Sequence, residues 1–253
     1  MNLFNLEGQV AIITGGNGGI GLAYARGLVK SGAKVAIWGR NEQKNQEAIS
    51  ELQALGGDVA AFVCDVTDEV QIAQAFDATI ARFEKVDICF ANAGGTGKQG
   101  LLHKTSTADW NAILDLNVTS VVNTYRPVIA HLIARKSQGK LIVTSSIASI
   151  MGMAYGAGYG TTKAAVMGLT RALAVELGRN NIQVNAILPG YIETELSTSG
   201  SQAFKDGVTR RTVTAMGTLE QMEGVAVFLA SKHSDFMTGQ GIVLDGGHSI
   251  HPM

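Results

Sequence analysis

The feature that most constrains the fold is the alternation of short apolar runs with helical segments along the whole chain. The apolar residues of these runs are consecutive rather than alternating, which is typical of strands in a sheet covered by helices on both faces. Strands separated by helices indicate a parallel sheet. The sequence therefore predicts an α/β fold with a doubly wound, seven-stranded parallel sheet. Its expected strands are Val10–Ile13, Lys34–Trp38, Val59–Val63, Val86–Ala91, Lys140–Thr144, Gln183–Leu188 and Gly241–Leu244.

Helices are expected wherever apolar residues recur at three- and four-residue spacing between these strands. These segments are Ile20–Lys30, Glu42–Leu55, Glu69–Phe83, Ala108–Ala134, Tyr159–Leu177 and Leu219–Leu229. The chain has only 3 Pro and no Ser/Pro-rich or highly charged linker, so residues 1–253 are expected to form one domain. The stretch 194–218 is rich in Ser, Thr and Gly and lacks clear periodicity, which makes it a candidate substrate lid.

Composition excludes several classes of function. With 20 Lys and Arg against 21 Asp and Glu, the chain has no basic field to attract nucleic acid or an anionic membrane. Its first seven residues do not resemble a secretion signal, and no run approaches the roughly 20 apolar residues of a membrane span, so a cytoplasmic protein is expected. The five His show no metal-ligand spacing, and Cys64 and Cys89 form no C-x-x-C pair. No metal site is predicted.

A glycine-rich turn, Thr14–Gly21, directly follows the first expected strand and opens the first helix. It fits a Gly-x-Gly-x-x-Gly pattern at Gly16, Gly18 and Gly21. Such a turn lets the backbone approach a pyrophosphate, whose charge is met by N–H groups at the helix N-terminus. The position predicts a Rossmann-type dinucleotide site, and the alternative is a purely structural turn. The cofactor contacts expected here are Gly15, Asn17, Gly18, Gly19, Ile20 and Gly21.

The end of the second strand bears on which dinucleotide binds. Dinucleotide folds usually place an acid there to bind the ribose 2′-hydroxyl, but here Gly39 stands in its place and is expected to leave room. Arg40 follows with a guanidinium suited to a 2′-phosphate, so NADP(H) is favoured over NAD(H). Alternatively, Arg40 only solvates the next helix. Asp65 is a candidate acceptor for the adenine amino group, and Asn92, Ala93 and Gly94 are expected to line the adenosine cleft, although each also suits an ordinary loop.

A candidate catalytic group lies further along the chain. Tyr159 and Lys163 are four residues apart, which puts them on one face of a helix. Ser146 lies 13 residues earlier, at the end of the fifth expected strand, so it can converge with Tyr159 on one substrate atom. The Tyr-x-x-x-Lys spacing alone is common on solvated helices. Its joint occurrence with the glycine turn is specific.

Together these features resemble the short-chain dehydrogenase/reductase family in its compact type, including 3-oxoacyl-carrier-protein reductases and sugar or polyol dehydrogenases. The likeness runs from Glu7 to Gly247. One departure is that Asn17-Gly18 lacks the basic residue that many NADP-binding members carry in this turn. The matching segments are Thr14–Gly21, Asp65-Val66, Asn92–Gly94, Asn117-Val118, Ser145-Ser146, Tyr159 with Lys163, Pro189-Gly190 with Thr194, and Gly239–Gly247.

The resemblance implies a role for each matching residue. Tyr159 would be the catalytic acid/base and Ser146 would hold the substrate oxygen. Lys163 would bind the nicotinamide ribose and lower the pKa of Tyr159, and Asn117 would hold a water that links Lys163 to solvent. The remaining implied cofactor contacts are Val66, Pro189, Gly190, Ile192 and Thr194.

We therefore expect an NADP(H)-dependent oxidoreductase that acts on a small ketone or secondary alcohol. The alternatives are a non-catalytic nucleotide-binding sensor or scaffold, and an isomerase or dehydratase of the same family. The resemblance implies a homotetramer or homodimer built on the helices Ala108–Ala134 and Tyr159–Leu177. The substrate pocket is expected between Gly94–Gln99, Ile147–Gly158 and the candidate lid.

Overall fold

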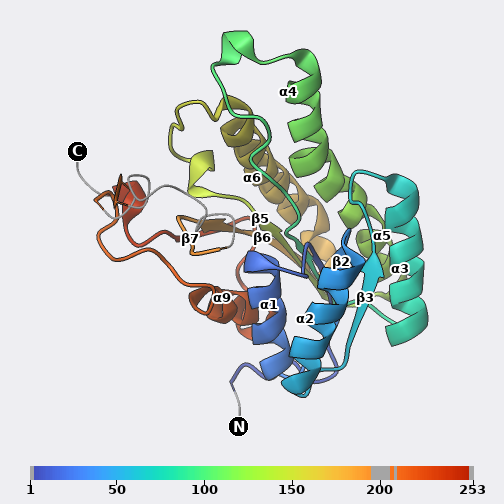
Figure 1. Ribbon diagram of the computed structural model, residues 1–253. Coiled ribbons are helices and arrows are strands. Elements are labelled where there is room, and N and C mark those ends of the chain that lie inside the picture. Colours follow the sequence, from blue (N-terminus) through green and yellow to red (C-terminus); the bar gives the residue numbers. More distant parts are fainter. Residues whose placement is uncertain (1–2, 195–205, 208–209, 251–253) are drawn as a thin grey trace.

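The computed structural model describes residues 3–194, 206–207 and 210–250, and the strands in this part of the chain form one parallel sheet (Figure 1). The strand order is β3-β2-β1-β4-β5-β6-β7, and every neighbouring pair is parallel. This confirms the predicted doubly wound α/β fold. The strands are β1 (Val10–Thr14), β2 (Lys34–Gly39), β3 (Val59–Val63), β4 (Ile88–Ala91), β5 (Gly139–Thr144), β6 (Ile182–Pro189) and β7 (Gly241–Leu244).

Helices cover both faces of the sheet (Figure 1). One hydrophobic core lies under α1, α2 and α9, and the other lies under α3, α5 and α6. Central strands therefore bury side chains on both faces, which explains their consecutive apolar residues. The helices are α1 (Gly19–Lys30), α2 (Glu42–Ala54), α3 (Glu69–Phe83), α4 (Thr107–Leu114), α5 (Ser120–Arg135), α6 (Ala157–Leu177) and α9 (Gln221–Ala230).

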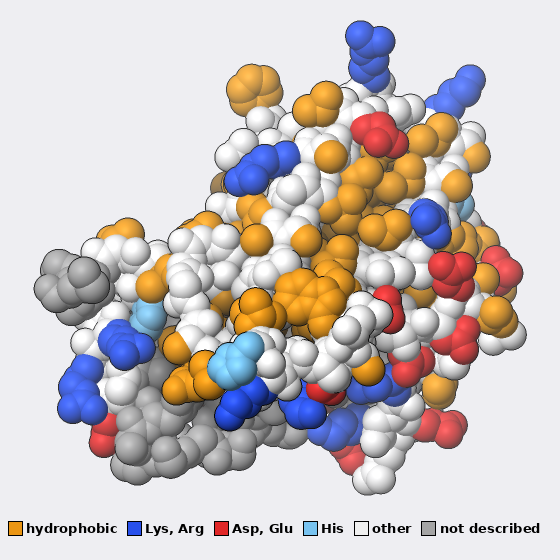
Figure 2. Space-filling view, turned by 90° about the horizontal axis from the view of Figure 1, so that it is seen from above, with side chains coloured by type: hydrophobic (Ala, Val, Ile, Leu, Met, Phe, Trp, Pro, Cys, Tyr) orange, Lys and Arg blue, Asp and Glu red, His pale blue; other side chains and the backbone are white. Residues whose placement is uncertain are grey.

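The chain reverses its direction of progress across the sheet at β1. Ala11 of β1 pairs with Val35 of β2 on one side and with Ile88 of β4 on the other. The first crossovers add β2 and β3 on one side, and the chain then returns to add β4 and later strands on the other side. A doubly wound sheet binds its ligand in the crevice that this reversal leaves at the carboxyl ends of the strands. Figure 2 looks onto this end, where hydrophobic side chains cross the middle of the face and charged ones gather toward its rim.

The segment Ala108–Ala134, which the sequence predicts as one helix, is interrupted. A π-helical turn, Asp115–Thr119, joins α4 to α5. The turn includes Asn117, whose buried side chain forms hydrogen bonds with the loop after β4 and with α6. Periodicity does not reveal such a local widening, and π turns occur frequently at functional sites.

The candidate lid, 194–218, is described only in part, because its residues 195–205 and 208–209 lie outside the described residues. Its base is fixed where Ile192 forms a β-bridge with Gly217. The Val213 amide also donates to the Gly246 carbonyl at 2.8 Å. Both ends of the segment are thus attached to the carboxyl-end face of the sheet. In the part of the chain described, no helix has the length and apolar character needed to cross a membrane.

Candidate active site

The glycine-rich turn packs against the loop after β4. Gly15 and Gly19 have φ angles of +63° and +50°, which favour glycine. A Cβ on Gly21 would lie 2.2 Å from the Gly15 carbonyl oxygen, so only glycine fits there. The Thr14 hydroxyl accepts hydrogen bonds from the amides of Asn92 (3.0 Å) and Ala93 (2.9 Å). These contacts hold the N-terminus of α1, with its positive dipole end, at the pocket.

A cavity of about 500 Å³ runs along the carboxyl ends of the strands from the glycine turn to α6. This volume lies within the range of cofactor sites. The bare glycine turn at a helix N-terminus fits a pyrophosphate, so the residues present fit a bound dinucleotide. The predicted site residues that line the cavity are Gly15, Asn17, Gly18, Gly19, Ile20, Arg40, Asp65, Val66, Asn92, Ala93, Gly94, Ser146, Tyr159, Lys163, Pro189, Gly190 and Thr194.

Three predicted residues lie outside the lining of this cavity. Gly21 packs against Gly15, and Asn117 lies behind Gly94, where a Cβ on that glycine would be 2.9 Å from the Asn117 Oδ1 atom. Ile192 lines a neighbouring pocket of about 430 Å³. Sequence reasoning also missed Lys44, an exposed lysine in the first turn of α2 that lines the cavity. Its position four residues after Arg40, at the start of the next helix, was the available signal.

Arg40 lies at the end of the cavity where the adenosine is expected. Its guanidinium is 3.7 Å from the Asp65 carboxylate, and its side chain is 72% exposed. The other Asp65 oxygen accepts from the Thr67 amide (3.0 Å) and hydroxyl (2.7 Å). Hydrogen bonds from Thr67, followed by the nearby Arg40 charge, lower the pKa of Asp65. Asp65 is therefore an anionic partner of Arg40, a contact that the sequence did not predict.

Gly39 lines the cavity, but the space on the side where its Cβ would lie is filled. A Cβ at this position would lie 2.3 Å from Asn17 Nδ2 and 2.5 Å from Asn45 Oδ1. Two asparagine side chains, one from the glycine turn and one from α2, fill the space beside the glycine. The sequence pattern does not predict this contact, because Asn17 and Gly39 are 22 positions apart in the chain.

Ser146, Tyr159 and Lys163 meet at the other end of the cavity. Tyr159 lies in the first turn of α6 and is hydrogen-bonded to Ser146, which directly follows the end of β5. Lys163 is buried one turn further along α6, with its Nζ atom 5.7 Å from the centroid of the Tyr159 ring. The Lys163 ammonium donates to the Thr144 carbonyl at 2.8 Å. The helix and the strand end thus produce the convergence that the sequence spacing predicts.

Burial dominates the protonation of these groups. It raises the pKa of Tyr159, and the Ser146 hydrogen bond opposes that shift. Burial also lowers the pKa of Lys163 to about 8. The expected lowering of the Tyr159 pKa by Lys163 is not seen, because burial outweighs the Ser146 hydrogen bond. Tyr159 is therefore protonated at neutral pH and suited to donate a proton.

Asn117 closes the back of this end of the cavity. Its Nδ2 group donates to the Gly95 carbonyl (2.8 Å) and to the Thr162 hydroxyl (3.0 Å). Its Oδ1 atom accepts from the Gly95 amide at 3.0 Å. Because the side chain is committed to these contacts, it clamps the loop after β4 onto α6. The role of Asn117 in holding a water that links Lys163 to solvent stays a prediction.

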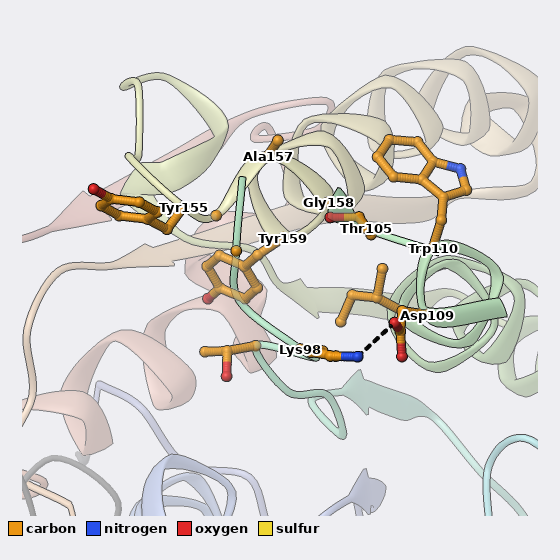
Figure 3. A pocket seen from close by; sticks show the side chains of 12 residues that line it. Lys98, Thr105, Asp109, Trp110, Tyr155, Ala157, Gly158 and Tyr159 are labelled. Atoms are coloured by element: carbon orange, nitrogen blue, oxygen red, sulfur yellow. Dashed lines mark hydrogen bonds and ion pairs between the residues drawn. The ribbon is translucent and has the colours of Figure 1, made fainter. Parts of the chain in front are cut away.

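The expected substrate walls, Gly94–Gln99 and Ile147–Gly158, do lie together beside Tyr159. The Gly100 amide donates to the Tyr155 carbonyl at 2.8 Å and ties the two loops to each other. Figure 3 shows Tyr159 between Tyr155 and the ion pair of Lys98 with Asp109, whose Nζ–Oδ2 distance is 3.0 Å. Tyr155 is 61% exposed and has a φ of +62°. Aromatic and charged side chains therefore border the approach to the candidate proton donor.

Known proteins resemble this chain over nearly its whole length. The family model described as enoyl-(acyl carrier protein) reductase matches residues 15–249. A 3-oxoacyl-[acyl-carrier-protein] reductase of Chlamydia pneumoniae is 36% identical and covers 96% of this chain and 97% of its own length. A gluconate 5-dehydrogenase of Gluconobacter oxydans is 34% identical, with 98% of both chains covered. A solved gluconate 5-dehydrogenase of Burkholderia cenocepacia, in complex with NADP and tartrate, is 37% identical with a TM-score of 0.92 and 98% of both chains covered.

The chain belongs to the short-chain dehydrogenase/reductase family. This confirms the resemblance on which the sequence-based roles depend. It also makes the chain an oxidoreductase of that family.

Proposed function

We propose that this short-chain dehydrogenase/reductase is an NADP(H)-dependent enzyme that transfers a hydride between the nicotinamide and a ketone or secondary alcohol. The observation that carries the proposal is the single cavity that joins the glycine turn to Ser146, Tyr159 and Lys163. A bound nicotinamide supplies the hydride. The chain's own residues position the substrate and move the proton.

In the reductive direction, the Tyr159 hydroxyl gives its proton to the carbonyl oxygen as that oxygen gains charge. Its raised pKa keeps it protonated at neutral pH. The Ser146 hydroxyl donates a hydrogen bond to the same developing alkoxide, an interaction whose loss typically costs on the order of 10²–10³ in rate. Lys163 lies beside the Tyr159 ring, one turn further along α6, where its ammonium would hold the nicotinamide ribose.

Asn117 supports the other three residues by holding the loop after β4 in place. By holding Gly95 and Thr162, its side chain keeps the loop after β4 against α6. Gly94 faces both Asn117 and Lys163, because a Cβ there would be 2.9 Å from Asn117 Oδ1 and 3.4 Å from Lys163 Nζ. Asn117 thereby fixes the wall against which Lys163 rests. We propose Ser146, Tyr159, Lys163 and Asn117 as one functional unit.

The preference for NADP(H) is supported by the charges at the adenosine end and by the NADP in the Burkholderia relative. Arg40 and Lys44 both line the cavity there. Asp65 competes with a 2′-phosphate for Arg40, so we expect a preference on the order of tenfold, the low end for a charge-assisted hydrogen bond. Titration of NADPH and NADH, followed by nicotinamide fluorescence, measures this ratio. Equal affinities, or tighter NADH, would overturn the assignment.

Turnover is tested by a screen that follows nicotinamide absorbance. The panel includes a 3-oxoacyl thioester and a keto sugar acid, the classes named for the relatives, together with simple cyclic and aromatic ketones. Oxidation of NADPH in step with alcohol formation is expected for at least one carbonyl. A non-catalytic sensor or scaffold would turn over none of them. An isomerase or dehydratase would form product with no net change in absorbance.

A further inference from the structure

Two asparagine side chains beside Gly39 form a hydrogen-bonded unit that the proposed reaction does not use. Asn45, on α2, is only 2% exposed. Its Nδ2 group donates to the Gly39 carbonyl at 3.0 Å, and its Oδ1 atom accepts from Asn17 Nδ2 at 2.7 Å. Asn17 Nδ2 also lies 3.5 Å from the Asn41 carbonyl. The unit connects the glycine turn to the end of β2 and the start of α2.

The hydrogen-bonding chemistry fixes the orientation of both amides. A main-chain carbonyl can only accept, so the Gly39 oxygen requires the NH₂ group of Asn45. That choice turns the Asn45 oxygen toward Asn17, which must then present its own NH₂ group. The Asn41 carbonyl favours the same orientation from a second direction. The Asn17 amide is therefore held with its nitrogen inward, and its remaining polar atom is an acceptor oxygen.

The acceptor oxygen belongs to a residue that lines the cofactor cavity. No hydrogen bond to Asn17 Oδ1 occurs among residues 3–194, 206–207 and 210–250. The Asn17 amide also occupies the volume that a side chain at position 39 would enter, since a Cβ there would be 2.3 Å from its nitrogen. Dinucleotide folds usually have at this place a carboxylate that accepts from the ribose 2′-hydroxyl.

We propose that Asn17, held by Asn45, is a neutral substitute for that carboxylate and accepts a hydrogen bond from the 2′-hydroxyl of NADH. Asn17 contacts the cofactor, and Asn45 is a positioning residue that acts through it. A neutral amide does not repel a 2′-phosphate as a carboxylate does, so the site accepts both cofactors and Arg40 biases the choice. The inference rests on the proposed dinucleotide function and adds the reason why its cofactor preference is limited.

The inference is tested by titrating NADH and NADPH into three variants, with nicotinamide fluorescence as the readout. Asn17→Ala removes the acceptor, so NADH affinity should fall about 3- to 10-fold, as for one neutral hydrogen bond, while NADPH affinity changes less than twofold. Asn45→Ala frees the Asn17 amide to turn its NH₂ group outward toward a phosphate, and should raise the ratio of NADPH to NADH affinity. Gln46→Ala, at an exposed neighbouring position on α2, is the control and should change neither affinity.

A merely structural role for the unit would weaken both cofactors by the same factor in Asn17→Ala and Asn45→Ala, and that result would overturn the inference. Should Asn45→Ala fail to fold, Asn17→Ala decides alone, because its side chain belongs to a turn and not to the core. The wild-type ratio tests a separate claim. A wild type that prefers NADH refutes the proposed NADP(H) preference but leaves the shift between wild type and variants to test the two asparagines.

Discussion

At the scale of single residues, the sharpest test of the mechanism is the Tyr159 hydroxyl. Tyr159→Phe removes the proton donor and the contact with Ser146, and leaves the ring in place. Turnover should fall by roughly 10²–10⁴, the usual contribution of a positioned general acid, while NADPH affinity stays within a few-fold. Steady-state rates on the best substrate of the ketone screen, together with cofactor titration, measure both quantities. A variant that keeps more than a tenth of wild-type turnover would contradict the assignment.

Tyr125→Phe provides a matched control for that substitution. The Tyr125 hydroxyl is buried on α5, and no hydrogen-bond partner for it is found within the described ranges. Loss of a buried hydroxyl without a partner should leave stability equal or higher, since no hydrogen bond is broken. Turnover should be unchanged, so any loss of rate specific to Tyr159→Phe reports on catalysis and not on the general effect of removing a tyrosine oxygen.

The buried Lys163 should make the free energy of unfolding depend on pH. Burial lowers its pKa to about 8, whereas an unfolded lysine stays near 10.4. Between these values the unfolded chain binds more protons, so this group's contribution to stability rises with pH. The buried ammonium destabilises the fold by up to roughly 3 kcal/mol below pH 8, and this penalty is lost by about pH 10.5. Lys163→Met should therefore unfold at higher urea concentration than wild type at pH 7, and we expect it to be inactive.

The difference in unfolding free energy between Lys163→Met and wild type should shrink toward zero between pH 8 and 10.5. Urea unfolding at pH 7 and pH 10 measures it, because the other titrating groups are shared by both proteins and cancel. Lys104→Met, at an exposed lysine, is the control and should show a small difference at both pH values. An equal gap at the two pH values for Lys163→Met would show that its burial penalty has been misjudged.

At the scale of elements, the close packing between the glycine turn and α1 sets a strict limit on side chains. Gly21→Ala places a Cβ 2.2 Å from the Gly15 carbonyl oxygen, so the turn must move away from the helix. We expect a destabilisation of about 1–3 kcal/mol, typical of overpacking, and a loss of NADPH affinity of more than tenfold. Thermal unfolding and cofactor titration measure the two effects.

Gly224→Ala on α9 tests the same chemical change where space is open. A Cβ there meets no atom within 4 Å, and the residue is exposed in a helix. It should stabilise the protein by roughly 0.5–1 kcal/mol through helix propensity and leave cofactor affinity unchanged. If Gly21→Ala behaved like Gly224→Ala, the turn would not be the rigid cradle that the geometry indicates.

The elements themselves were predictable from the sequence, whereas their local irregularities were not. Consecutive apolar residues in β1, β2 and β4 indicate burial on both faces, and this pattern is visible within each strand's own sequence. The π turn at Asn117 and the filled space at Gly39 depend on contacts between separate elements. No local periodicity encodes that Asn45 of α2 will meet Asn17 of the first turn. The catalytic spacing was predictable because one helix holds both Tyr159 and Lys163.

At the scale of the whole molecule, the sheet topology explains why the residues of the site are so far apart in sequence. The reversal at β1 opens a crevice beside β4, and every strand points its carboxyl end toward the same face. Loops after β1, β2, β3, β4, β5 and β6 therefore all contribute to one cavity. The sequence motifs are spaced by whole strand-helix units for this reason, and their order along the chain follows from the winding of the sheet.

An exposed face of α6 supports the expected self-association. Ala165, Gly168, Ala172 and Val175 are exposed at three- and four-residue spacing, and Val175 is 85% exposed. Small residues let two helices approach closely, so we propose that this face contacts a second copy in a homodimer or homotetramer.

Light scattering at micromolar concentration should give a multiple of the 26.5 kDa chain mass. A charge buried in such an interface is costly, so Val175→Glu should shift the mass toward that of one chain. Val70→Glu, at a 65% exposed position on α3, should leave the mass unchanged. A wild type that scatters as a single chain would refute the association, and one that stays associated as Val175→Glu would place the contact elsewhere.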